Sequence, residues 1–225
     1  MTNRALLSTT YFGPIQWYQK LHRYPSVMME SMESFPKQTF RNRCVIATAN
    51  GPQALSVPVE PPSRDIRSVD DTPTASAHKA AVRDIRISDH GNWRHLHRQA
   101  LVSAYGDSPF FPYYADDILP FFEKRWAFLY DFNLEITLKM CELLDIHPHI
   151  GHSSAFLPPD DASLNGSDRT ADDFRYAIRP KHPLPDDDFQ PKPYYQVFKQ
   201  KQGFLPNLSI LDLLFNEGNE SIFYL

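Results

Sequence analysis

The stretch from Lys37 to Val59 constrains the fold most strongly, because it reads as two strands joined by a tight turn. Asn50-Gly51 accepts the positive φ angles that a two-residue hairpin turn requires. Residues that favour a pleated, half-buried surface stand on both sides of this turn: Val45, Ile46 and Ala47 before it, and Leu55, Val57 and Val59 after it. Pro58 cannot donate a ladder hydrogen bond, so we predict that the second strand ends there or forms an edge.

Alternation along the first of these strands places Arg41 and Arg43 on one face, together with Thr39. Two guanidinium groups on one face suit a phosphate or a carboxylate. The alternative is that both arginines are solvated or paired with nearby carboxylates. The ligand-binding residues predicted in this stretch are Lys37, Arg41, Asn42 and Arg43.

Helical periodicity is clearest over residues 92–105 and 126–144, where apolar residues recur at every third or fourth position. A strand is predicted over residues 4–12, followed by a helix with Pro14 at its first position. Other predicted strands cover residues 27–35, 82–88, 153–156 and 194–199, and other predicted helices begin at 116, near 174 and at 209. We expect mobile loops near residues 60–80 and 157–193.

These elements predict one mixed α/β or α+β domain over residues 1–225. We expect a mixed sheet with the hairpin at one side and the buried 126–144 helix across it. The net charge of −4 and the pI near 6.1 argue against a sequence-independent nucleic-acid binder. No apolar run approaches the length of a membrane helix, and the N-terminal segment does not read as a signal peptide. The expected protein is cytoplasmic, without nucleic-acid partner, membrane insertion or cofactor.

Three histidines stand close together at His147, His149 and His152. In an extended segment the first two would face one way and the third the other. No cysteine or carboxylate follows at an obvious fourth-ligand spacing, so no metal site is predicted.

His97 lies on the apolar face of the 92–105 helix, between Trp93 and Leu101. A hydrocarbon face has no structural use for an imidazole unless a partner meets it, so His97 is a candidate general base. The alternative is a core histidine that is hydrogen-bonded to a carbonyl. Tyr11, at the carboxyl end of the first predicted strand, stands where α/β sheets commonly bind ligands. The aromatic residues expected to frame an acceptor are Tyr105, Tyr113 and Tyr114.

The chain has two cysteines, Cys44 and Cys141, which form neither a disulfide framework nor a zinc-ribbon spacing. Cys44 with His97 as base would give a nucleophilic mechanism. The alternative is a buried and unreactive thiol, since Cys44 shares its strand face with Ile46. The predicted catalytic residues are therefore His97, Tyr105 and Cys44.

Several stretches resemble the WbqC-like family of bacterial proteins: 11–15 (Tyr-Phe-Gly-Pro-Ile), the hairpin 37–59, 105–111 and 203–218. The resemblance implies a role in O-antigen and related surface-polysaccharide biosynthesis, around nucleotide-activated sugars. It supplies no catalytic residue set.

Three functions follow as hypotheses. In the first, a transferase holds the anionic group of a nucleotide-sugar on Arg41 and Arg43, with His97 as the base. In the second, a ligand-binding or scaffold protein uses the same arginines without chemistry. The third is an amidase or acyltransferase that works through Cys44. The transferase hypothesis requires the arginines and His97 to open into one shared pocket.

Overall fold

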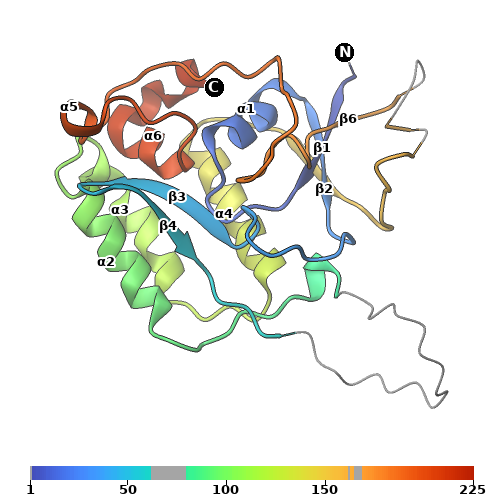
Figure 1. The fold of residues 1–225 in the computed structure, drawn as a ribbon, viewed down its shortest axis with the longest axis horizontal. Coiled ribbons are helices and arrows are strands. Elements are labelled where there is room, and N and C mark those ends of the chain that lie inside the picture. The colour runs from blue at the N-terminus through green and yellow to red at the C-terminus, as the bar shows by residue number, and fades with distance from the viewer. Residues whose placement is uncertain (1, 62–79, 162, 165–168) are drawn as a thin grey trace.

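A parallel four-stranded sheet forms the centre of the computed structural model, which describes residues 2–61, 80–161, 163–164 and 169–225. Its strands are β1 (Arg4–Ser8), β2 (Ser26–Glu30), β5 (His149–His152) and β6 (Asp172–Asp173), in the order β5-β2-β1-β6 (Figure 1). Four of the five β1 residues are buried, as expected for a parallel strand covered on both faces. The α/β class is confirmed.

Helix α1 (Ile15–Arg23) connects β1 to β2 and buries Trp17, Tyr18 and Leu21. Pro14 occupies the N-cap, one residue before the predicted position. Between β1 and α1 the backbone turns sharply, with Phe12 at a φ of 41°. This conformation is uncommon for a bulky residue.

The predicted hairpin is present as β3 (Arg43–Thr48) and β4 (Gly51–Ser56), and Gly51 has a φ of 109° at the turn. It forms a two-stranded antiparallel sheet of its own, so it does not extend the central sheet as we predicted. β3 begins at Arg43, and residues 37–42 before it are not strand. The alternation that placed Arg41 and Arg43 on one face was therefore wrong.

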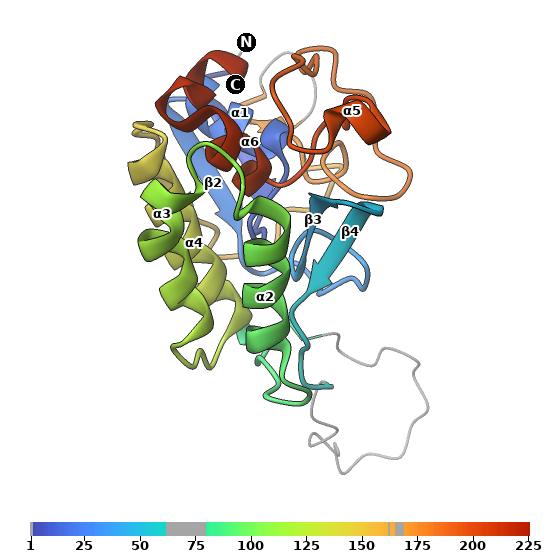
Figure 2. The same cartoon turned by 90° about the vertical axis from the view of Figure 1, so that its left-hand side faces the viewer.

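The helices pack beside the hairpin and the sheet (Figure 2). Helix α2 (Trp93–Tyr105) matches its predicted range closely, and α4 (Leu129–Leu143) buries Leu129, Phe132, Ile136 and Met140 completely. Ser209 caps α6 (Ile210–Glu217), and its side-chain oxygen accepts a hydrogen bond from the Leu211 N–H. The remaining helical segments are α3 (Phe111–Ile118), α5 (Lys199–Gln202) and the 3-10 turns η1 (Val82–Asp84), η2 (Leu119–Phe122) and η3 (Gly218–Tyr224).

Several predicted elements were wrong. Residues 82–88 contain η1 and isolated bridges instead of a strand, and α5 follows irregular chain where a strand was predicted over 194–199. The strand near the histidines is β5 at 149–152 and not 153–156, and residues 174–178 form a turn after β6. Most of the loop predicted near 60–80 lies outside the described residues. Within the described chain, no helix combines the length and apolarity needed to cross a bilayer.

Candidate functional site

The Arg41 side chain is buried and pairs with a carboxylate of the protein itself. Its Nε and Nη2 donate to the two carboxylate oxygens of Glu33, and Nη2 also donates to Ser8 Oγ at 2.6 Å. These bonds tie the end of β1 to the segment after β2. The edge of the guanidinium formed by Nε and Nη2 is therefore taken by Glu33 and not by a ligand, and this corrects its predicted role.

The neighbouring residues of that stretch are also used locally. Arg43 Nε donates to Ser56 Oγ at 3.0 Å, across the hairpin, and Asn42 Nδ2 donates to the Val57 carbonyl at 2.8 Å. Lys37 is exposed. The four ligand-binding residues predicted in the 37–59 stretch therefore do not gather around one opening.

His97 lies in the core, with 5% of its surface exposed. Its Nδ1 lies 2.8 Å from the Tyr11 hydroxyl, and its ring packs against Trp93 and Phe122. Burial lowers the pKa of His97 to about 4, against a smaller opposing contribution from a hydrogen bond to the Ser56 main chain. The imidazole is therefore neutral at pH 7, and its polar contacts are with the protein.

The predicted tyrosines are dispersed. Tyr105 is buried, donates to Asp212 Oδ1 at 2.9 Å and accepts from the Ala47 N–H at 3.3 Å. Tyr114 donates to Asn219 Oδ1 at 2.8 Å, whereas Tyr113 is 75% exposed. They do not frame a common acceptor site.

The Cys44 thiol is buried, and burial raises its pKa to about 12. A thiol of this kind is protonated at neutral pH and is not a nucleophile. The histidine-rich segment has separate partners: His147 pairs with Asp145, and His152 Nδ1 lies 2.7 Å from the Tyr130 hydroxyl. In the part of the chain that the structure describes, no three His, Cys, Asp or Glu residues converge as metal ligands would.

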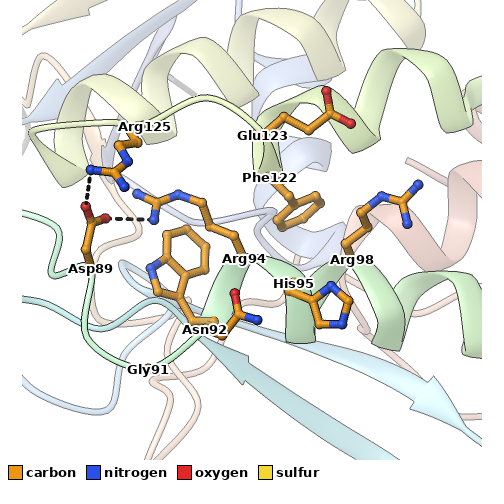
Figure 3. A pocket seen from close by; sticks show the side chains of 10 residues that line it. Asp89, Gly91, Asn92, Arg94, His95, Arg98, Phe122, Glu123 and Arg125 are labelled. Carbon is orange, nitrogen blue, oxygen red and sulfur yellow. Dashed lines mark hydrogen bonds and ion pairs between the residues drawn. The ribbon is translucent and has the colours of Figure 1, made fainter.

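A pocket of about 370 Å³ lies at the N-terminal end of α2 (Figure 3). Its walls come from α2, the segment before it and the chain after η2. The lining residues are Asp89, Gly91, Asn92, Trp93, Arg94, His95, Arg98, Phe122, Glu123 and Arg125. The three arginines outnumber the two carboxylates, so the pocket carries a net positive charge.

Two of these arginines share one carboxylate. Arg94 Nη1 donates to Asp89 Oδ1 at 2.7 Å, and Arg125 Nη1 lies 3.4 Å from Asp89 Oδ2 (Figure 3). The Arg94 guanidinium also stacks over Trp93, with 4.7 Å between its central carbon and the ring centroid. Arg98 makes no ion pair with any described residue. It is therefore the arginine most available to a bound anion.

His97 lies directly behind this pocket, because two of its ring neighbours line the wall. The ring centroids are 5.2 Å apart for His97 and Trp93, and 6.2 Å apart for His97 and Phe122. Phe122 also packs on Phe12, in the turn after β1. The histidine found from the sequence thus supports the pocket wall from inside.

The family model of the WbqC-like protein family matches residues 9–176, which is more than half of the chain. The chain belongs to the WbqC-like protein family. The match covers the pocket and the hairpin but stops before the 203–218 stretch that contributed to the resemblance. Searches among curated proteins and among solved structures gave no significant match.

Sequence reasoning missed the arginines of this WbqC-like protein. Arg94 and Arg98 stand four residues apart on α2, a spacing that brings them to one side of a helix. This signal was present in the sequence. The contribution of Asp89 and Arg125 depends on chain folding and has no local signal.

Proposed function

We propose that this WbqC-like protein acts in surface-polysaccharide biosynthesis in the cytoplasm, where it binds a nucleotide-activated sugar or a related anionic ligand. The ligand's anionic group would lie in the pocket at the N-terminal end of α2. The observation that carries the proposal is that three arginines, Arg94, Arg98 and Arg125, line this pocket.

The physical chemistry of the pocket supports an anion. Guanidinium groups form short, charge-assisted hydrogen bonds to phosphate, and the N–H groups and dipole at a helix N-terminus favour negative charge. The volume of about 370 Å³ falls near the lower end of small-molecule sites. A nucleotide-sugar would therefore place its anionic part inside and extend its remaining groups over the rim. The polysaccharide context comes from the family resemblance.

Transfer chemistry is the second candidate, and His95 is the observation that favours it. This imidazole lines the pocket beside the arginines, on an exposed position of α2. His95 would act as the general base, which is the role that the sequence analysis gave to His97. A transferase would lose turnover in His95→Gln while keeping its ligand affinity, whereas a binding protein would show no turnover in either form.

The test of binding is isothermal titration calorimetry with a panel of nucleoside diphosphate sugars. We expect one class of sugar nucleotide to bind, and Arg98→Ala to weaken that binding by roughly ten- to a hundredfold, because a hydrogen bond to a charged group contributes about 1.5–3 kcal/mol. Arg43→Ala is the matched control, since Arg43 lies outside the pocket. Equal affinities for the two variants, or no binding across the panel, would refute the proposal.

A further inference from the structure

A carboxylate of the chain itself already occupies the arginine pair in the pocket. Asp89 bridges Arg94 and Arg125 with one oxygen toward each, at 2.7 and 3.4 Å (Figure 3). The hydrogen bond from Arg94 lowers the pKa of Asp89, against a smaller opposing effect of desolvation, and the charges of both arginines lower it slightly more. The Asp89 carboxylate thus occupies the place where the anionic group of the proposed ligand would bind.

We infer that Asp89 is an internal competitor that an anionic ligand displaces. This inference rests on the proposed function. It adds a residue that sets the affinity of the pocket for anions.

Displacement is compatible with the surroundings of Asp89. Its side chain is 50% exposed, so a displaced carboxylate returns to water and is not left buried. The preceding residue, Ser88, donates its backbone N–H to the Pro58 carbonyl, and this bond stays intact when only the Asp89 side chain rotates. Arg94, by contrast, is held by its stacking on Trp93 and is only 15% exposed. The arginine would therefore stay in place while its partner changes.

The affinity of the pocket for anions follows from this exchange. Asp89 is tethered beside the arginines, so its effective concentration there is high. Every anion that takes its place must displace it, and each binds more weakly by the same factor.

Arg98 lies one turn of α2 beyond Arg94, about 6 Å along the helix axis. Figure 3 shows its guanidinium at the opposite end of the pocket from Asp89 and Arg125, with Phe122 and His95 between them. An anion in the place of the Asp89 carboxylate would therefore contact Arg94 and Arg125, and Arg98 would meet a more distant group of the ligand.

The experiment measures binding of inorganic pyrophosphate and of malonate by calorimetry at low ionic strength, with the full-length protein. The variants are Asp89→Asn and Glu123→Gln. The second is the matched control, because Glu123 lines the same pocket but makes no ion pair with a described residue. Both variants remove one negative charge from the pocket, and only the first removes the competitor.

We expect Asp89→Asn to tighten the binding of pyrophosphate and of malonate by about three- to tenfold each, and Glu123→Gln to tighten them by less than twofold. Weaker binding in Asp89→Asn would show that Asp89 orients the arginines, and equal tightening in both variants would show a general charge effect. Either result would overturn this inference but not the proposed function. An unmodified protein that binds neither pyrophosphate nor any sugar nucleotide would overturn the proposed function as well.

Discussion

Replacing Arg41 by alanine should destabilise the protein strongly without removing a ligand contact. The guanidinium makes two hydrogen bonds to Glu33 and one to Ser8, and the Arg41 and Glu33 side chains are only 8% and 10% exposed. Without Arg41, the Glu33 carboxylate stays buried with its charge unpaired. Breaking a buried ion pair in this way costs about 3–5 kcal/mol of unfolding free energy.

The same substitution at Arg43 is the reference against which this loss of stability is compared. Arg43 is half-buried and makes one hydrogen bond, to Ser56, so Arg43→Ala should cost about 0.5–1.5 kcal/mol. For a chain of this size, 1 kcal/mol corresponds to roughly 2–4 °C in the midpoint of thermal unfolding. Arg41→Ala should therefore lower that midpoint by roughly 6–20 °C.

Urea denaturation with linear extrapolation measures both variants, and pyrophosphate titration is repeated on each. A second change that removes the buried carboxylate as well, Arg41→Met with Glu33→Leu, should recover much of the lost stability. The reasoning fails if Arg41→Ala is as stable as Arg43→Ala and has lost pyrophosphate binding. That result would restore the predicted anion site on the hairpin stretch.

Three further predictions concern buried groups. Burial lowers the pKa of His97 to about 4, so as the pH falls the imidazole is protonated in the unfolded chain before it is protonated in the folded chain. The stability of the fold should therefore decrease as the pH drops from about 6.5 to 4. Urea midpoints at pH 7 and pH 5 should therefore differ more for the unmodified protein than for His97→Asn, and an equal difference would contradict the assigned burial. Cys44 and Cys141, whose pKa values burial raises to about 12, should react with a thiol reagent only as fast as the protein unfolds, so rapid labelling of Cys44 in native buffer would contradict this. Tyr194→Phe removes a donor to the buried Asp212 carboxylate and should cost about 1–3 kcal/mol in denaturant unfolding, while no loss would show that Asp212 does not depend on it.

Elements with strong local signals could be predicted from the sequence. The apolar spacing of α2 and α4 gave both helices, and the Asn50-Gly51 pair gave the hairpin turn. Ser209 marked the start of α6. In each case the deciding information lies within a few residues of the element itself.

The rest depends on contacts between distant parts of the chain. Arg41 looked like an open strand residue because nothing near it in the sequence shows that Glu33 would reach its guanidinium in the core. Gln38, with a φ of 60°, breaks the extended conformation that the alternation required. The strands β5 and β6 are too short to give a pattern of their own.

The candidate site could be predicted only in part. His97 was singled out because an imidazole stood on an apolar face, and the structure gives it Tyr11 as a partner and a position behind the pocket wall. The pocket itself joins Asp89, the first turns of α2 and Arg125, which come together only in the folded chain. Arg41 and Arg43 were paired because alternate residues of a strand share a face, but residues 37–42 are not strand.

A crystal structure of the protein with bound pyrophosphate tests the central claim most directly. We predict that the anion lies within hydrogen-bonding distance of Arg94 and Arg125, and that the Asp89 carboxylate is turned out to solvent. An anion bound beside Lys37 and Arg43, or one that leaves the Asp89 bridge intact, would contradict the account.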